Sequence, residues 1–126
     1  MQRCLRIRIE ELNLAAELAH TPSADALWDA LPLKAQAHRW GDELYFRVPF
    51  QPPLENDARE VVQAGDVAYW PDGPALCFFF GPTPISRPGE IRPASAVNVC
   101  GRIQGDSTVL QQVRDTATVT LTREEA

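Results

Sequence analysis

The chain has 126 residues, and we expect a single domain over residues 1–123 followed by a polar tail at residues 124–126. Hydrophobic residues make up 44% of the chain and charged residues 23%, both ordinary values for a globular protein. The net charge of −5 and the scattered basic residues argue against a nucleic-acid partner, because an acidic surface repels the phosphate backbone.

The cysteines and the N-terminal segment indicate a compartment. Cys4, Cys77 and Cys100 are odd in number, far apart and placed inside predicted strands, which is typical of free thiols in a reducing environment. No apolar run is long enough to span a membrane, and the first residues lack the apolar core of a signal peptide. We therefore expect a cytoplasmic protein without a membrane partner.

The first predicted elements are a hairpin and a helix. Residues 4–10 alternate between apolar and charged side chains, as a half-buried strand does, and a tight connection at Asn13 leads to a second strand over residues 14–18. Thr21 is a suitable N-cap, Pro22 suits the first helical position, and Pro32 ends the helix. The apolar stripe of this helix is Ala24, Leu27, Trp28 and Leu31.

A second hairpin follows, with strands at residues 34–40 and 43–49 and a two-residue turn at Gly41 and Asp42. In its second strand Glu43 and Tyr45 share one face. A proline-broken connection, a short strand at residues 59–63 and a strand at residues 67–70 come next. Pro71 to Pro74 form a turn.

The stretch from residue 75 to residue 103 is the most informative part of the chain. A dense apolar run at residues 76–80 predicts a buried strand, and residues 97–103 predict another. Between them, residues 81–96 form a long loop stiffened by four prolines. Long loops held between buried strands often carry binding sites, so we expect the functional site here.

The C-terminal part adds a second short helix, beginning at Gly105 and Asp106, and a last strand over residues 116–122. About eight short strands and two helices, separated by turn signals, predict a mainly β fold. We expect a closed or nearly closed antiparallel β-barrel with the two helices capping its ends.

Sequence motifs for common catalytic chemistry are missing. The histidines, His20 and His38, form no metal-binding pattern, and neither a GxSxG nucleophile motif nor a glycine-rich phosphate loop occurs. Cys77 is flanked by apolar residues and is interpreted as an inert buried thiol. We expect no metal and no cofactor.

The remaining candidates are polar and aromatic residues placed on the outward face of the middle strands and around the long loop. An arginine with aromatic neighbours can present a planar fork of donors to a carbonyl or carboxylate. Other interpretations stay open, since Arg39 and Glu43 could form a cross-strand ion pair, Glu90 and Arg92 could brace the loop, and Phe79 could belong to the core. The candidates are Arg39, Glu43, Tyr45, Phe79, Thr83, Glu90, Arg92, Ser95 and Asn98.

Several segments resemble the cyclophilins, in the same order along the chain. AHR at residues 37–39 resembles the cyclophilin F-H-R stretch, CFFF at residues 77–80 resembles Q-F-F-I, and VNVCGRI at residues 97–103 resembles H-V-V-F-G-K-V. A closer resemblance is to a prokaryotic group of short cyclophilin-like proteins without assigned function. It rests on RWGDE at residues 39–43, the segment 65–71, FFGPTP at residues 79–84 and EIRPAS at residues 90–95.

This resemblance implies a catalytic role for Arg39 and a proline-pocket role for Phe79. It also shows departures, since Val97 stands where cyclophilins have the pocket histidine and Cys77 where they have the glutamine. The proline-rich loop replaces the loop that carries the cyclophilin tryptophan. The resemblance thus implies a degenerate isomerase pocket, although prolyl isomerisation needs little beyond a desolvating pocket and one donor.

Our leading hypothesis is a cyclophilin-like barrel that binds a small molecule or a proline-containing peptide. One alternative is a weak peptidyl-prolyl cis-trans isomerase that uses Arg39. Another is a small-molecule enzyme or enzyme subunit acting on a carboxylate or amide through Arg39, Glu43 and Arg92. This enzyme hypothesis predicts a raised pKa for Glu43 or Glu90 in a closed pocket. A structural interaction domain, marked by a large apolar surface patch, is a further class.

Overall fold

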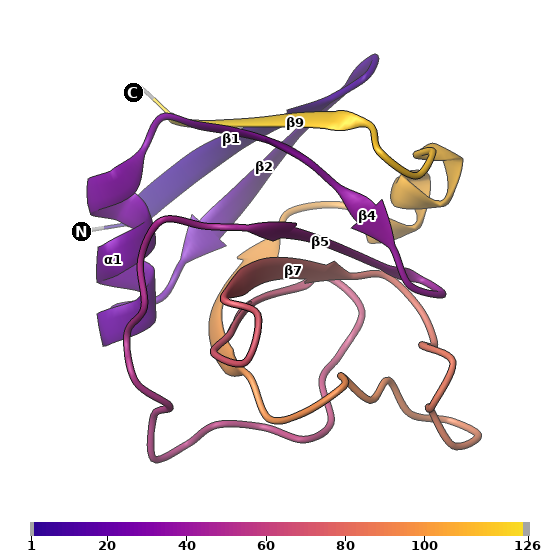
Figure 1. Cartoon of the computed structure of the whole chain (residues 1–126). Helices are drawn as coiled ribbons and strands as arrows, with labels where there is room; N and C mark the ends of the chain where they lie inside the picture. The colour runs from indigo at the N-terminus through magenta and orange to yellow at the C-terminus, as the bar shows by residue number, and fades with distance from the viewer. Residues whose placement is uncertain (1, 125–126) are drawn as a thin grey trace.

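A computed structural model describes residues 2–124, so that of the predicted tail only Glu124 is described and residues 125 and 126 lie outside. The described chain contains nine strands, one α-helix and one 3-10 helix (Figure 1). They are β1 (Arg3–Ile9), β2 (Leu12–Leu18), α1 (Pro22–Ala30), β3 (Leu33–Gln36), β4 (His38–Arg39), β5 (Glu43–Arg47), β6 (Asp66–Trp70), β7 (Ala75–Phe79), β8 (Asn98–Ile103), η1 (Ser107–Gln112) and β9 (Thr118–Arg123).

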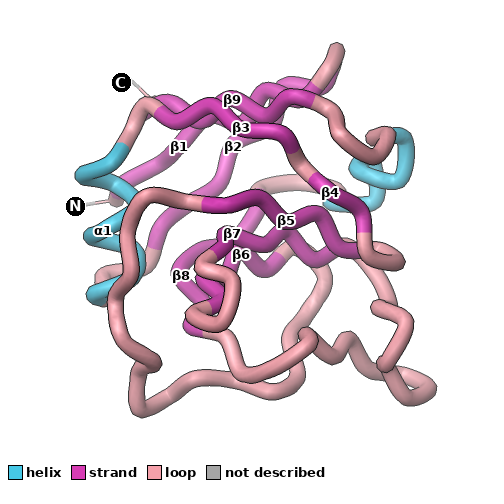
Figure 2. The backbone as a smooth tube through the Cα atoms, viewed as in Figure 1, coloured by secondary structure: helices cyan, strands magenta, loops and turns pink. Residues whose placement is uncertain are grey.

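The strands form one antiparallel sheet in the order β3-β9-β1-β2-β8-β6-β7-β5-β4. Its two edge strands, β3 and β4, are separated only by Ala37, and this bent segment brings the edges of the sheet together. The backbone of Ala37 donates to Ala117 and accepts from Thr116, both at 2.8 Å, which ties the bend to the segment before β9. The predicted nearly closed barrel is confirmed, with nine strands rather than about eight (Figure 2).

Alternation along the strands places one set of apolar side chains inside the barrel. Leu5, Ile7 and Ile9 of β1 are fully buried, as are Leu44 and Phe78 of the strands β5 and β7. Burial of this kind is the main favourable contribution to folding. The interior therefore follows the apolar pattern of the sequence directly.

The helices lie on opposite sides of the barrel in Figure 2. The Thr21 side chain accepts from the backbone N–H of Ala24, and Pro22 occupies the first turn of α1, as predicted. The second helix is a 3-10 helix that begins after its cap, Asp106. None of the helices in the described part of the chain is long and apolar enough to cross a membrane.

Three predicted boundaries are wrong. The first turn lies at Glu10 and Glu11, with Glu10 at φ 54°, and Asn13 belongs to β2. The expected strand at residues 59–63 consists only of isolated bridges from Arg59 to Val97 and from Val62 to Ile91. The expected strand at residues 34–40 is interrupted at Ala37, because the barrel closes there.

A second apolar cluster lies on the other face of β6 and β7, outside the barrel interior. Its buried members are Val62, Ala68, Cys77, Phe79 and Val97. The isolated bridges at Arg59 and Val62 hold the chain segments that cover this cluster. One of these covering segments belongs to the long loop at residues 81–96, which was predicted to carry the site.

Candidate functional site

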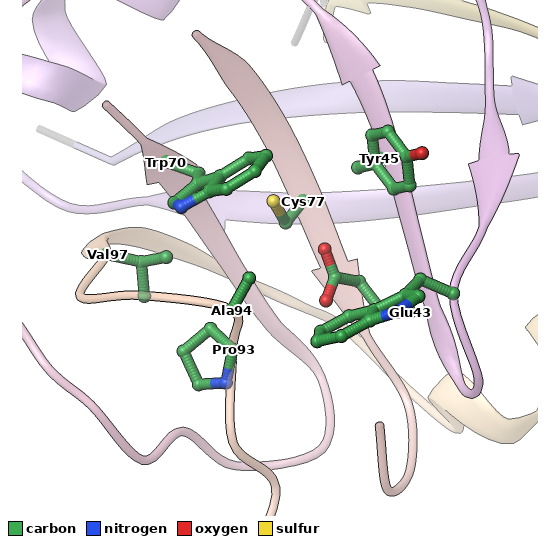
Figure 3. A pocket seen from close by; sticks show the side chains of 8 residues that line it. Glu43, Tyr45, Trp70, Cys77, Pro93, Ala94 and Val97 are labelled. Carbon is green, nitrogen blue, oxygen red and sulfur yellow. The ribbon is translucent and has the colours of Figure 1, made fainter. Parts of the chain in front are cut away.

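A pocket of about 310 Å³ opens between this outer face of the sheet and the end of the proline-rich loop (Figure 3). Strands and the β4–β5 turn supply one wall, and residues 93–97 supply the other. We call it the Glu43 pocket; its lining residues are Trp40, Glu43, Tyr45, Trp70, Cys77, Pro93, Ala94 and Val97.

Strand register explains why these side chains meet. Tyr45 of β5 pairs with Cys77 of β7, and residues paired across a ladder point to the same face. Glu43 lies two residues before Tyr45 and therefore shares that face. The N–H of Trp40 donates to the carbonyl of Glu43 at 3.0 Å, which places Trp40 opposite Glu43 at the turn.

Glu43 is the main polar group of the pocket. It is only 5% exposed, and its Oε1 is buried without a hydrogen-bond partner among the described residues. Burial penalises the charged form and raises the pKa of Glu43 from 4.5 to about 7, while the neighbouring Cys77 thiol acts in the opposite direction. The carboxyl group therefore carries a proton in a substantial fraction of molecules at neutral pH.

Cys77 is 1% exposed, and burial, followed by the charge of Glu43, raises the pKa of its thiol well above the ordinary value. A thiol in this state stays protonated, and a protonated thiol is a poor nucleophile. Cys77 therefore contributes wall and shape to the pocket, in agreement with its interpretation as an inert thiol.

The loop that covers the pocket is braced by one serine. The Ser86 Oγ accepts from the backbone N–H groups of Thr83 and Arg92, both at 2.9 Å. The Thr83 hydroxyl in turn donates to the carbonyl of Arg92, and the Arg92 Nε donates to Glu90 at 2.7 Å. These contacts hold the chain just before Pro93 in one conformation.

Four further hydrogen bonds, two on each side, fix the rim. The Trp70 indole N–H donates to Ser95 Oγ at 2.6 Å, and the Ser95 hydroxyl donates to Asp72 at 2.5 Å. At the other side, the N–H of Asp42 donates to Pro82 at 2.9 Å, and the N–H of Phe80 donates to Asp42 at 3.0 Å. The β4–β5 turn that carries Trp40 is therefore bonded to the beginning of the loop.

The structure brings together only part of the predicted site. Glu43 and Tyr45 line the pocket, and Ser95 touches it through Trp70. Glu90 and Arg92 form an ion pair that braces the loop, which is the alternative to a ligand-binding role that the sequence left open. Thr83 is a buried loop contact.

Two predicted residues are buried elsewhere. Phe79 lies on the outer face but is 0% exposed, inside the second cluster, as the core interpretation had it. The Asn98 amide donates to Ser23 at 2.8 Å and to the carbonyl of Pro53 at 3.0 Å, so it joins α1 to a loop. Both residues support the fold around the pocket and are not among its lining residues.

Arg39 does not share a face with Glu43, contrary to the sequence prediction. It pairs with Leu44, whose side chain lies inside the barrel, and paired residues share a face. Arg39 therefore lies on the inner face of the sheet, opposite the face that carries Glu43. Its Nη1 donates to the carbonyls of Gln111 and Val113, both at 3.1 Å, and its guanidinium lies 5.1 Å from the ring centre of Phe80.

The expected cross-strand pair of Arg39 with Glu43 is replaced by a pair with Asp42, at 3.2 Å. The Nε of Arg39 also donates to the carbonyl of Gly41 at 3.2 Å. Arg39 therefore fastens the β4–β5 turn to the segment around η1. In the described structure it is not among the residues that line the Glu43 pocket.

The fold agrees with the comparisons. The model of the family described as Cyclophilin-like matches residues 3–122, nearly the whole chain. The chain belongs to the cyclophilin-like family. A hypothetical protein from Archaeoglobus fulgidus, known from a solution structure, is 45% identical to this cyclophilin-like chain, with a TM-score of 0.81. The match covers 98% of this chain and 95% of that protein. Among curated proteins, no match was found.

Several residues that line the Glu43 pocket of the cyclophilin-like chain were not among the predicted candidates. Trp40 could have been found, because a two-residue turn places it opposite Glu43. Trp70 shares its face with Ala68, which pairs with Cys77, but strand alternation alone gives no reason to prefer it. Within residues 2–124, no group of three or more His, Cys, Asp or Glu side chains is placed to hold a metal ion.

Proposed function

We propose that the Glu43 pocket binds a small organic molecule. The observation that carries the proposal is the carboxyl group of Glu43, buried at 5% exposure in an apolar pocket, with its Oε1 left without a partner in the described chain. A buried polar atom without a partner costs about 1–3 kcal/mol, so a bound molecule that satisfies it gains this free energy. A pocket with one such anchor has the composition of a ligand site.

The size and lining of the pocket support the same proposal. Its volume of about 310 Å³ lies near the lower end of the range for small-molecule pockets, about 300 to 1,000 Å³. Trp40, Tyr45 and Trp70 are half-buried and offer ring surface to a ligand. The braced loop holds the opposite wall, so little ordering is needed when a ligand enters.

A second candidate is an enzyme that uses Glu43 for proton transfer. The specific observation is the pKa of Glu43, raised by burial to about 7, because a general acid or base works best when its pKa is near the operating pH. Unlike the enzyme hypothesis drawn from the sequence, this candidate uses Glu43 without Arg39 or Arg92, since both arginines are engaged in contacts outside the pocket. A reaction on an amide or carboxylate would need another electrophilic group.

Prolyl isomerisation receives less support. The resemblance assigns the polarising donor to Arg39, and the guanidinium of Arg39 is already bonded to the carbonyls of Gly41, Gln111 and Val113. We keep weak isomerase activity as a third candidate. It is tested with a proline-peptide assay of the wild type and of Arg39→Ala, and a rate equal to background in both contradicts it.

The proposed setting is the cytoplasm of a prokaryote. Cys4, Cys77 and Cys100 are free thiols in the described structure, which suits a reducing compartment. The similar protein from Archaeoglobus fulgidus supports a prokaryotic setting.

A thermal-shift screen against metabolites tests the proposed function. A molecule that binds the native state raises the melting temperature by mass action. Ala94 is an exposed lining residue, so Ala94→Trp fills the pocket from its rim, while Ala64→Trp adds the same side chain at an exposed site that is not among the lining residues. We expect hits that act on the wild type and Ala64→Trp but not on Ala94→Trp. Hits unaffected by Ala94→Trp would contradict the assignment of the site.

A further inference from the structure

We infer that the molecule bound by the Glu43 pocket is an organic cation, an amine with an apolar or aromatic body. This inference rests on the proposed function and names the chemistry of its ligand. It follows from the charge of the lining, from the aromatic rings beside Glu43 and from the size of the pocket.

The lining carries one acidic group and nothing to balance it. Among the described residues that line the pocket, Glu43 is acidic and none is basic. The nearby arginines are already engaged, because Arg39 is bonded to backbone carbonyls and Arg92 to Glu90. A carboxylate or phosphate ligand would meet like charge here without a compensating cation, whereas a cation would meet an unopposed carboxylate.

The aromatic side chains favour the same charge. Trp40, Tyr45 and Trp70 contribute ring surface to a pocket whose polar contribution is small. The faces of such rings attract cations, and tryptophan does so most strongly. Figure 3 shows the carboxyl group of Glu43 pointing into the space bordered by Trp70, Cys77 and Ala94. A cation in this space contacts both the carboxylate and ring surface.

A protonated amine can supply both a hydrogen bond to the buried Oε1 of Glu43 and a counter-charge for its carboxylate. A neutral N–H donor would supply a hydrogen bond to the buried Oε1 but would leave the ionised carboxylate without a counter-charge. An ammonium group supplies the hydrogen bond and the charge together, and charge-assisted hydrogen bonds are about twice as strong as neutral ones. A volume of about 310 Å³ equals the share of roughly ten water molecules in the liquid, which suits an amine the size of 2-phenylethylamine.

The ionisable groups that face Glu43 from the surrounding elements are few. Tyr45 lies on the same strand and Cys77 on β7, while Trp70 and residues 93–97 contribute no ionisable side chain. The raised pKa of the Cys77 thiol keeps it neutral at ordinary pH. Glu43 is therefore the lining group that titrates near pH 7, and cation binding requires its ionised form. Affinity for a cation should rise as the pH rises through 7.

The test uses three probes that share a ring and differ in charge: 2-phenylethylamine, 2-phenylethanol and 3-phenylpropionate. Each is titrated into the wild type and into Glu43→Gln at pH 8, with binding followed by calorimetry and by the indole N–H signals of Trp40 and Trp70 in NMR spectra. We expect the amine to bind the wild type about tenfold or more tightly than the alcohol, and the carboxylate to bind weakest. Glu43→Gln should remove the preference for the amine.

A second pH separates charge from shape. Between pH 8 and pH 6 the affinity for the amine should fall about tenfold, because the ionised fraction of Glu43 falls by that factor. The affinity for the alcohol should stay within about twofold. Glu43→Gln keeps the size of the side chain, and an unchanged NMR spectrum outside the pocket shows that the variant is folded.

The outcomes distinguish this inference from the proposed function. Equal or tighter binding of the alcohol or the carboxylate at the same indole signals overturns the cation inference and leaves a ligand pocket in place. Binding of the amine with no change at Trp40 or Trp70 overturns it as well. If none of the probes binds, the inference is wrong for amines of this size, and the metabolite screen with Ala94→Trp decides the proposed function separately.

Discussion

The carboxyl group of Glu43 and the thiol of Cys77 face each other across β5 and β7. Tyr45 pairs with Cys77 and Glu43 pairs with Phe79, so Glu43 lies diagonally opposite Cys77 on one face of the sheet. Both groups are buried, burial disfavours the charged form of each, and the charge of Glu43 further disfavours the thiolate of Cys77. This arrangement places an acid that titrates near neutral pH on an apolar wall.

The first prediction concerns stability and pH. Below pH 4.5 Glu43 is protonated in both the folded and the unfolded chain, so its ionisation does not lower the free energy of unfolding. Above pH 7 the folded state must bury the charged carboxylate, which lowers the free energy of unfolding. Raising the pKa from 4.5 to about 7 corresponds to a cost of up to about 3 kcal/mol at pH 8. Urea unfolding of Glu43→Gln, compared with the wild type, should show a relative stabilisation that grows from pH 4 to pH 8.

The matched control is Glu11→Gln, at an exposed carboxyl group in the first turn. It removes one carboxyl group at an exposed site and so corrects for the change in net charge. A difference for Glu43→Gln that is flat with pH, or that shrinks as the pH rises, would rule out a raised pKa for Glu43.

The second prediction concerns the turn that carries Trp40. Gly41 has φ 61°, and a Cβ at this position would lie 2.8 Å from Pro84 Cδ and 3.0 Å from the carbonyl oxygen of Pro82. Gly89 also has a positive φ, 82°, but a Cβ there would meet nothing within 4 Å in the described structure. Gly41→Ala should therefore cost about 2–3 kcal/mol and Gly89→Ala about 1 kcal/mol, as measured by urea unfolding. Equal costs would show that the turn does not pack closely on the loop.

The third prediction separates a structural role of Arg39 from a catalytic one. Arg39→Ala removes hydrogen bonds to the carbonyls of Gln111 and Val113 and should lower the free energy of unfolding by about 1–3 kcal/mol. Arg39→Lys should recover little of this loss, because an ammonium group lacks the planar fork. Full stability of Arg39→Ala would contradict the structural role.

The fourth prediction concerns thiol reactivity. Cys4 is half-buried, whereas Cys77 and Cys100 are buried. Burial raises the pKa of the Cys100 thiol to about 12 and that of Cys77 well above its ordinary value. A thiol reagent should modify Cys4 first, and Cys4→Ser should remove the fast phase, with the other thiols reacting only when the protein opens. Labelling of Cys77 as fast as Cys4 would disagree with the described pocket.

The barrel could be predicted because its strands alternate clearly. Leu5, Ile7 and Ile9 identify the inner face of β1 without any knowledge of the fold. The interruption at Ala37 could not be predicted from local pattern, since it depends on closure of the sheet against the segment before β9. The first turn was misplaced because Glu10 adopts a positive φ, which is uncommon outside glycine.

The site was predictable only in part. The face of Glu43 and Tyr45 followed from strand alternation, and the same two-residue turn already pairs Arg39 with Leu44. Trp40 follows Arg39 directly in the chain, but this pairing places Arg39 on the face opposite Glu43. Burial of Glu43 depends on how residues 93–97 fold over the sheet, and this long-range packing has no local signal.

The most direct measurement is an NMR titration of the Glu43 carboxyl carbon, first in the free protein and then with saturating 2-phenylethylamine. The described pocket predicts a pKa of about 7 for Glu43 in the free protein and a clearly lower value when the amine is bound, because a cation favours the ionised form. A pKa near 4.5 in the free protein, unchanged by the amine, would contradict the assignment of Glu43 as the buried acid of a ligand site.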